Sequence, residues 1–320
     1  MSKPVLAITR RLPRAVEARA AEEFTARLSP ADAPVITADI LRMCQGADAL
    51  LCCPAERLDA GTIAALPPSI KVIGTFSVGY DHIDLAAART RGLPVVNTPD
   101  VLSIATAELT MLLILAAARR AGEGERLLRA GKWPGWSPTW LIGTQVSGRR
   151  LGIFGMGRIG RELARMARGF GMEIHYHNRT RLPPPLEQGA TFHPTDATFL
   201  PVCDVLSLNA PGGEATRAWL NAERIAKLPV GAVVVNAGRG ALVDDGALIA
   251  ALRGGHLAAA GLDVYNGEPK LHEGYLGLEN AVLLPHLGSS TATARDAMGH
   301  LALDGIAAVL AGQAPKNLIT

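Results

Sequence analysis

The chain has 320 residues, of which 48% are hydrophobic and 19% charged, a composition typical of a folded globular protein and not of a disordered one. This length exceeds what one hydrophobic core usually organises, so we expect two domains. The formal net charge is only +3, and no basic run is interleaved with aromatic residues, which argues against a nucleic-acid partner.

Cysteine usage and hydropathy exclude several further classes of protein. The four cysteines lack the density and spacing of a disulfide framework or a zinc site, so we expect no metal. Cys52 and Cys53 are adjacent in an apolar stretch, so we expect them to be buried, reduced thiols. No signal peptide is recognised at the start, and the longest apolar run, 111–118, is too short to span a bilayer. We therefore expect a cytoplasmic protein without a membrane partner.

The first part of the chain alternates short apolar runs with Ala-rich segments. The runs predict strands at 5–8, 49–53, 72–75 and 95–97, and the segments between them predict helices at 13–28, 59–66 and 84–91. A strand–helix alternation of this kind indicates a parallel sheet with crossover helices.

A second series of the same kind begins near residue 150. Strands are predicted at 151–154, 173–177, 205–208, 233–236, 261–264 and 282–284, with helices near 159–170, 222–227 and 244–254. Six strands with intervening helices make a complete dinucleotide-binding sheet.

The two series are joined at Pro99, which favours an extended backbone before it. A long helix at 103–120 follows the join, and a last helix at 292–310 could return to the first domain. The expected fold is therefore α/β, with two Rossmann-like, doubly wound parallel-sheet domains and a cleft between them. We expect a flavodoxin-like substrate domain from 1–100 plus 290–320, and a dinucleotide-binding Rossmann domain from 101–289.

A glycine-rich turn, Gly-Met-Gly-Arg-Ile-Gly at 155–160, lies between a predicted strand and a predicted helix. In this setting Gly155 allows the tight turn, Gly157 lets the backbone approach a pyrophosphate, and Gly160 lets helix and strand pack closely. The free N–H groups at the helix start favour an anion. The alternative is a tight strand–helix turn without a ligand.

The end of the next strand indicates which nucleotide binds. Dinucleotide-binding chains usually place Asp or Glu there, to bond the ribose hydroxyls, but this chain has no carboxylate between 174 and 186. Arg179 with Thr180 would instead bind a 2′-phosphate, because a guanidinium offers a planar fork of donors. We therefore predict NADP(H) as the preferred cofactor, with NAD(H) possible; the alternative is a solvated basic turn.

Three further strand ends carry polar side chains, and ligands bind at such ends in open α/β sheets. Arg239 stands between two glycines, where it could bind a substrate carboxylate, although a surface arginine on a flexible turn is an alternative. Asp263 and Glu268 both follow the end of one predicted strand, although taken alone such a composition is common in loops. His286 follows an apolar strand and could exchange protons near neutral pH with Glu268 as its partner, unless it is an isolated histidine.

In the order and spacing of these motifs, at 155–160, 236–240, 263–269 and 285–289, the chain resembles the D-isomer-specific 2-hydroxyacid dehydrogenase family across nearly its whole length. Within the family it most resembles the glyoxylate/hydroxypyruvate reductases, through the segments 76–82, 97–102 and 133–140.

The resemblance implies roles for the catalytic residues. Arg239 would bind the substrate carboxylate and carbonyl, His286 would protonate the keto oxygen, and Glu268 would keep His286 protonated. Hydride attack on a keto carbon builds negative charge on oxygen, which Arg239 would stabilise and His286 would quench.

The motifs and the resemblance also imply a cofactor set and a substrate set. The cofactor set is Thr106, Gly155, Met156, Gly157, Arg158, Ile159, Gly160, His177, Asn178, Arg179, Thr180, Asn209, Ala210, Pro211, Thr216, Ala237, Gly238, Asp263 and Gly288. The substrate set is Cys52, Val78, Gly79, Arg239, His286, Ser289 and, from a partner subunit, Trp136.

The expected oligomeric state is inferred from Trp136. In the similar reductases the matching tryptophan reaches the partner's active site, which implies a homodimer; ordinary packing of the group Trp133, Trp136 and Trp140 is the alternative.

The expected function is NADPH-preferring reduction of glyoxylate and hydroxypyruvate to D-2-hydroxy acids. The alternatives are a reductase of larger 2-keto acids such as 2-ketogluconate, and a dinucleotide-sensing, corepressor-like binding protein. The complete set of Arg239, Glu268 and His286 favours turnover.

Overall fold

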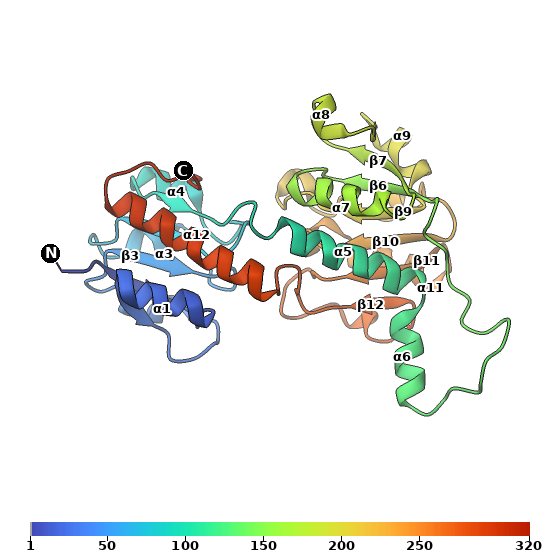
Figure 1. Cartoon of the computed structure of the whole chain (residues 1–320), viewed down its shortest axis with the longest axis horizontal. Coiled ribbons are helices and arrows are strands. Elements are labelled where there is room, and N and C mark those ends of the chain that lie inside the picture. Colours follow the sequence, from blue (N-terminus) through green and yellow to red (C-terminus); the bar gives the residue numbers. More distant parts are fainter. Residues whose placement is uncertain (1) are drawn as a thin grey trace. The chain divides into compact units, whose positions relative to one another are not determined.

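The computed structural model describes residues 2–320 and divides into two compact units (Figure 1). The first unit runs to Leu102 and resumes at Ser289–Thr320, and the second unit is Ser103–Gly288. The boundaries expected from the sequence, after residues 100 and 289, lie one or two residues from these. Among residues 2–320, no helix has both the length and the apolar character needed to cross a bilayer.

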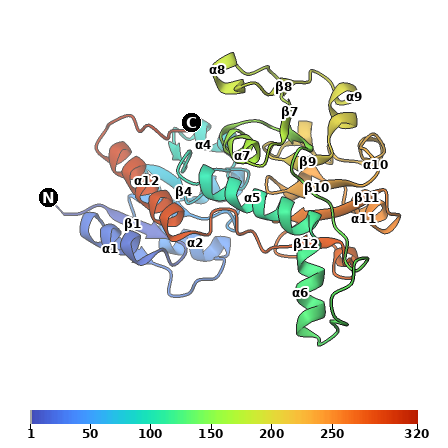
Figure 2. The same ribbon diagram turned by 45° about the vertical axis from the view of Figure 1, so that its right-hand side comes forward.

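The first unit is built on a five-stranded parallel sheet with strand order β2-β1-β3-β4-β5, the flavodoxin-like order. Two of its helices, α1 and α12, lie side by side although they come from opposite ends of the chain (Figure 2). The strands are β1 Val5–Ile8, β2 Thr25–Leu28, β3 Ala49–Cys52, β4 Val72–Thr75 and β5 Val95–Val96, and the helices are α1 Arg14–Glu23, α2 Thr37–Met43, α3 Ala60–Ala65, α4 Leu85–Thr90 and α12 Ala292–Leu310.

The structure corrects the helix predicted at 13–28. Helix α1 ends at Glu23, the buried Phe24 is extended, and Thr25–Leu28 forms the edge strand β2. In β2 exposed and half-buried residues alternate, because an edge strand covers the core with one face only. The Ala/Glu-rich sequence before it made the helix look longer than it is.

The second unit is built on a seven-stranded parallel sheet with strand order β12-β11-β10-β9-β6-β7-β8. Counted from β6, the first six strands follow the order 3-2-1-4-5-6 of a dinucleotide-binding sheet. The strands are β6 Arg150–Phe154, β7 Glu173–His177, β8 Thr191–Phe192, β9 Val205–Leu208, β10 Ala232–Asn236, β11 Leu257–Leu262 and β12 Ala281–Leu283. The predicted class, two doubly wound parallel-sheet domains, is confirmed.

The helices of the second unit cover both faces of its sheet (Figure 1). Along the fully buried β10, Val233 and Val235 join the core under α5 and α7, whereas Val234 joins the core under α10 and α11. A strand buried on both faces reads as a continuous apolar run, as 232–235 does. The helices are α5 Ser103–Ala118, α6 Ala121–Arg129, α7 Arg158–Arg168, α8 Pro184–Glu187, α9 Asp196–Phe199, α10 Ala222–Ile225 and α11 Asp245–Arg253, with short 3₁₀ turns at Leu200–Val202, Glu214–Thr216, Gly240–Leu242 and Glu273–Tyr275.

The strand order of this sheet reverses between β6 and β9, which are hydrogen-bonded neighbours. At such a point the connections from the two strands leave in opposite directions, and a ligand-binding crevice opens at the carboxyl ends. The glycine turn follows β6 and the segment 209–211 follows β9, so the fold places both predicted cofactor segments at this point.

Candidate active site

The glycine motif forms the turn between β6 and α7. Gly155 has φ = +92°, and a Cβ on it would lie only 2.5 Å from the backbone nitrogen of Ala210. A Cβ on Gly160 would lie 2.8 Å from the carbonyl oxygen of Gly155, so α7 can pack against the turn only if this residue is glycine. A Cβ on Gly157 would meet no atom within 4 Å, so the space beside the start of α7 is open.

The turns after β6 and β9 fit a dinucleotide. The 11-residue helix α7 begins at Arg158, so its unpaired N–H groups lie beside the open space at Gly157. The side-chain oxygen of Asn209 accepts a hydrogen bond from Ser207 at 2.7 Å, whereas its buried amide nitrogen has no partner in residues 2–320. A buried amide without a partner is unfavourable, and a ligand oxygen would satisfy it.

The segment after β7 separates into internal and solvent-facing residues. The side-chain oxygen of Asn178 accepts from the backbone N–H of Met156 at 2.7 Å, which ties this segment to the glycine turn. Nδ1 of His177 lies 2.7 Å from the carbonyl oxygen of His193. Arg179 and Thr180 are exposed. Among the residues predicted to select the nucleotide, the Arg179 guanidinium and the Thr180 hydroxyl are therefore the accessible groups.

Arg239 leaves the end of β10 in a turn that Asn236 holds. The Asn236 amide nitrogen donates to the carbonyl of Arg239 at 2.9 Å, and its oxygen accepts from the N–H of Gly238 at 3.1 Å. A Cβ on Gly240 would lie 1.9 Å from the carbonyl carbon of Tyr265, so the turns after β10 and β11 are in close contact. This approach requires glycine at 240 and places Arg239 next to the loop that carries Glu268.

Glu268 and His286 form the central contact of the site. Oε2 of Glu268 lies 2.7 Å from Nδ1 of His286, and Oε1 accepts from the backbone N–H of Tyr265 at 2.8 Å. His286 lies in the loop after β12 with φ = +55°, and about half of its side chain (49%) is exposed. The ring is thus fixed through one nitrogen while it remains accessible.

The protonation of this pair follows from its surroundings. Burial alone would raise the pKa of Glu268, but the hydrogen bond and charge of His286, the N–H of Tyr265 and the charge of Arg239 together lower it below its usual value. Glu268 is therefore ionised at neutral pH and can only accept. Nδ1 of His286 must donate to it, which leaves Nε2 as the nitrogen that can exchange a proton.

Asp263 holds the loop that carries His286. Its buried carboxylate accepts from the backbone N–H groups of Leu287 at 2.6 Å and Gly288 at 2.8 Å. Burial raises the pKa of Asp263, and these two N–H groups oppose the shift. A Cβ on Gly288 would lie 3.3 Å from the Thr106 side chain, so Thr106 lines the same place. The sequence predicted Asp263 as a cofactor residue, and its contacts also make it a support for the histidine loop.

Two supporting residues of this site were not recognised in the sequence. Asn236 holds the arginine turn. The Tyr265 hydroxyl shares its one proton between the carbonyl oxygens of Leu262, at 3.0 Å, and Leu284, at 2.8 Å. Tyr265 thereby ties the ends of β11 and β12 together. Asn236 could have been suspected, because a polar residue that ends a buried apolar strand needs partners; Tyr265 gave no such signal.

The predicted substrate residues Val78, Gly79 and Ser289 lie in the first unit. In the turn at 78–79, Asn97 donates to the carbonyl of Val78 at 2.8 Å, and the Ser77 hydroxyl donates to the carbonyl of Gly79 at 2.6 Å. Both carbonyl groups are thus engaged inside the unit.

Cys52, another predicted substrate residue, is the last residue of β3. Its side chain is fully buried, and its Sγ lies 3.4 Å from the carbonyl oxygen of Gly74 in the neighbouring strand β4. Trp136, by contrast, is 85% exposed in the loop after α6.

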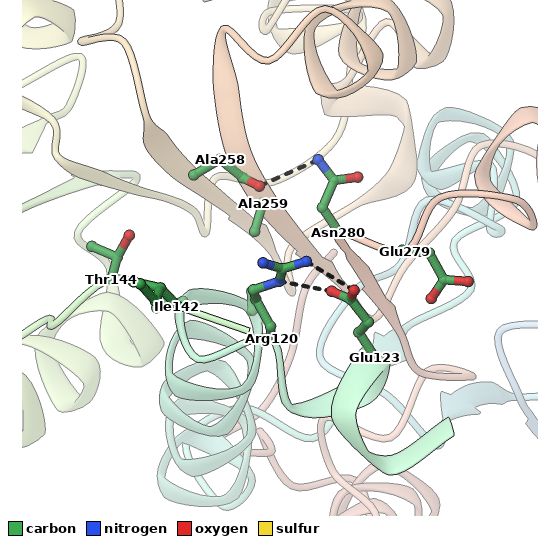
Figure 3. Close-up of a pocket in the computed structure, with 11 residues that line it drawn as sticks. Arg120, Glu123, Ile142, Thr144, Ala258, Ala259, Glu279 and Asn280 are labelled. Carbon is green, nitrogen blue, oxygen red and sulfur yellow. Dashed lines mark hydrogen bonds and ion pairs between the residues drawn. The ribbon is translucent and has the colours of Figure 1, made fainter. Parts of the chain in front are cut away.

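A surface hollow lies elsewhere in the second unit, near the start of α6 (Figure 3). The ion pair of Arg120 and Glu123 borders it, and Asn280 donates to the carbonyl of Ala258 on its opposite side. None of the predicted site residues lines it. In residues 2–320 no group of three or more His, Cys, Asp or Glu side chains could hold a metal ion.

Comparison with known proteins covers both units. The family model for the D-isomer specific 2-hydroxyacid dehydrogenase NAD binding domain matches residues 111–288. The chain is 45% identical over 315 residues to the glycerate dehydrogenase of Hyphomicrobium methylovorum, covering 98% of each protein. It is 39% identical over 322 residues to the glyoxylate reductase of Thermococcus onnurineus, covering 99% of this chain and 96% of that one.

A solved structure shows the same similarity in three dimensions. The NADPH-dependent glyoxylate/hydroxypyruvate reductase of Sinorhizobium meliloti, in complex with NADP and malonate, superposes with a TM-score of 0.88 at 32% identity, covering 100% of this chain and 97% of that chain. The resemblance inferred from the motifs is confirmed: the chain belongs to the D-isomer-specific 2-hydroxyacid dehydrogenase family of oxidoreductases and is similar to members named glycerate dehydrogenase and glyoxylate reductase.

Proposed function

We propose that this enzyme reduces small 2-keto acids, glyoxylate and hydroxypyruvate, to D-2-hydroxy acids and prefers NADPH. The observation that carries the proposal is the 2.7 Å contact between Glu268 and His286 at the sheet edge where Arg239 also lies. The names of the relatives, glycerate dehydrogenase and glyoxylate reductase, support this substrate class.

Each side chain has one task in the proposed reduction. The Arg239 guanidinium binds the substrate carboxylate and stabilises the negative charge that grows on the keto oxygen. A reduced nicotinamide supplies the hydride when it is bound. The Nε2–H of His286 gives its proton to the keto oxygen, so that the ketone gains one hydride and one proton and becomes the alcohol. Glu268 holds the ring and stabilises its charged form; in the reverse direction His286 accepts the proton.

NADPH preference rests on the solvent-facing residues after β7. Arg179 and Thr180 are exposed, and the adjacent Asn178 is neutral and bonded to Met156, so no carboxylate would repel a 2′-phosphate here. The S. meliloti reductase whose structure contains NADP has the same fold. Arg179 is the group that we propose contacts the phosphate.

The test is a substrate and cofactor panel. Oxidation of NADPH and of NADH is followed with glyoxylate, hydroxypyruvate and 2-ketogluconate. We expect kcat/KM to favour NADPH and the two small acids. Arg179→Ala should lower kcat/KM with NADPH by about tenfold or more, with little change for NADH, since one charge-assisted contact is lost.

Three other outcomes would each point elsewhere. A preference for 2-ketogluconate would favour a reductase of larger acids, and no oxidation with any acid would favour a dinucleotide-sensing protein. Equal losses with both cofactors in Arg179→Ala would contradict the phosphate contact.

We further propose that the enzyme is a homodimer in which Trp136 reaches the partner's substrate site. Trp136, Trp133, Leu128 and Ile142 are exposed large apolar side chains in α6 and the loop after it, which project from the second unit (Figure 2). Such side chains are favoured at interfaces. Trp136→Ala should alter the ratio of kcat/KM values between glyoxylate and hydroxypyruvate and leave the affinity for NADPH nearly unchanged; an unaltered ratio rejects this role.

A further inference from the structure

A buried carboxylate lies behind the segment that carries Arg179. The Glu187 side chain, at the end of α8, is only 8% exposed. It accepts from the Tyr176 hydroxyl at 2.5 Å and from two nitrogens of Arg181 at 2.8 and 3.1 Å. The Tyr176 oxygen also accepts from the backbone N–H of Leu182 at 3.0 Å. Tyr176, Arg181 and Glu187, here named the β7–α8 clamp, thus fix both the backbone and a side chain of the segment.

Both ends of the segment are anchored as well. At its start Asn178 is bonded to Met156 of the glycine turn. At its end Arg168 of α7 donates to the carbonyl oxygens of Glu187 at 3.1 Å and Gln188 at 2.8 Å. Only positions 179 and 180 lie between the anchor at Asn178 and the clamp at Arg181.

The two arginines of this segment, Arg179 and Arg181, have different roles. A buried carboxylate is strongly unfavourable unless a cation and hydrogen bonds compensate it, and Arg181 supplies both to Glu187. Arg181 is therefore committed to the protein itself. Arg179, two residues earlier, is also exposed but makes no ion pair with a carboxylate in residues 2–320. Its guanidinium is therefore available to a ligand anion, whereas that of Arg181, although 65% exposed, is paired with Glu187.

We propose that Tyr176, Arg181 and Glu187 are positioning residues for NADPH: the clamp holds the 178–182 backbone so that Arg179 and Thr180 already face the place of the 2′-phosphate. The proposal rests on the NADPH preference proposed above. A segment that is ordered before binding loses less conformational freedom on binding, which favours affinity. NADH lacks the phosphate, so its affinity does not depend on where Arg179 points.

Two variants test the clamp. Tyr176→Phe removes the hydroxyl that joins Glu187 to the Leu182 N–H, and Glu187→Gln removes the charge while it keeps the volume. In each we expect the dissociation constant and the KM for NADPH to rise about fivefold, the size of one lost hydrogen bond. The constants for NADH and kcat with glyoxylate should stay within about twofold.

Calorimetric titration with NADPH and with NADH reads the effect without a keto acid, and the melting temperature of each variant shows that it is folded. Two variants are used because Tyr176 is fully buried and its replacement can affect folding. Glu223→Gln is the matched control: Glu223, on α10, forms an exposed ion pair with Lys227 just after the helix, and the loss of this pair should change neither cofactor's affinity.

The outcomes separate this proposal from the one on which it rests. If the wild-type enzyme does not discriminate between NADPH and NADH, the cofactor preference is wrong and the clamp has no selectivity to support. If the wild-type enzyme prefers NADPH but both folded variants keep its ratio of the two dissociation constants, the preference stands and the clamp proposal is overturned. Equal weakening of both cofactors overturns it too.

Discussion

Two carboxylates of the second unit, Glu268 and Glu187, each bind a cationic side chain, but in opposite settings. Glu268 is 32% exposed, and its partner His286 is 49% exposed. Glu187 is only 8% exposed and lies between a fully buried tyrosine and Arg181, whose side chain is 65% exposed. The first pair lies on the side of the sheet that is formed by β10, β11 and β12. The second pair lies beside β7, on the other side of the strand order.

The difference between the partners explains the difference between the tasks. Both carboxylates have a lowered pKa: the hydrogen bonds from Arg181 and Tyr176 lower that of Glu187, and in Glu268 the interactions with His286 and Arg239 exceed the opposing effect of burial. Arginine stays charged at any working pH, so the Glu187 pair can only hold structure. Histidine gains and loses a proton near neutrality, so the Glu268 pair can take part in chemistry.

The largest expected effect comes from removing the cation that faces the substrate. Arg239→Ala should lower kcat about a hundredfold to a thousandfold, the loss seen when a donor to a developing oxyanion is removed. The dissociation constant of NADPH should change little, because Arg239 is not part of the β7–α8 clamp. Steady-state kinetics with glyoxylate and titration with NADPH measure the two.

Arg42→Ala is the matched control for this prediction. Arg42 forms an exposed ion pair with Asp39 in the first unit, and its loss should leave kcat unchanged. A nearly wild-type kcat in Arg239→Ala would remove Arg239 from the mechanism.

The next effect separates the two carboxylates by pH. Glu268→Gln keeps a hydrogen-bond acceptor for Nδ1 of His286 but removes the negative charge that favours the protonated ring. Reduction needs that proton, so the falling limb of the rate profile should move to lower pH, with about a tenfold loss near pH 8 and a smaller loss in mild acid.

Glu187→Gln provides the comparison, because Arg181 does not titrate in this range. Its reduction profile at saturating NADPH should keep the wild-type shape. A profile that moves in both variants, or in neither, contradicts the division between a proton-exchanging pair and a structural pair.

Much of the fold could be predicted because buried parallel strands leave a clear signal. The strands at 5–8, 72–75, 173–177 and 205–208 were predicted with the bounds that the structure has. The misses are elements without that signal. β2 is an edge strand with alternating exposure directly after a helix, and β8 has only two residues. β11 ends at Leu262, before the predicted 264, because Asp263 already turns to bind Leu287 and Gly288.

The site was predictable only where residue type and position combine in one motif. An arginine between glycines, or a histidine after an apolar strand, can be recognised locally. The partnership of Tyr176 with Glu187 cannot, because the two are eleven residues apart and only the fold turns the glutamate inward. The burial of Cys52, by contrast, could be expected from its run of apolar neighbours, because every residue of β3 is buried.

The smallest expected effect concerns a third carboxylate, Asp204, at the amino-terminal ends of β6 and β9 in the same sheet. It accepts from the backbone N–H and from two guanidinium nitrogens of Arg150, at 3.0, 3.0 and 2.7 Å, and so ties the starts of β6 and β9 together. Asp204→Asn should lower the free energy of unfolding by only about 1 kcal/mol at neutral pH. Arg150 is about one-third exposed, so the surrounding water screens its attraction to Asp204. Denaturant titration measures this loss.

The pH dependence of that loss identifies its origin. The hydrogen bond from Arg150 lowers the pKa of Asp204 below its usual 3.8, so the folded state binds its proton more weakly than the unfolded state does. The stabilisation is complete above the unfolded pKa and disappears as the pH falls through the folded one. Wild type and Asp204→Asn should therefore converge in strong acid, whereas Asp39→Asn, in an exposed helical pair, should differ little from wild type at any pH. If the loss persisted in acid, packing rather than charge would account for it, and kcat should be untouched in either case because Asp204 lies at the end of the sheet away from Glu268 and His286.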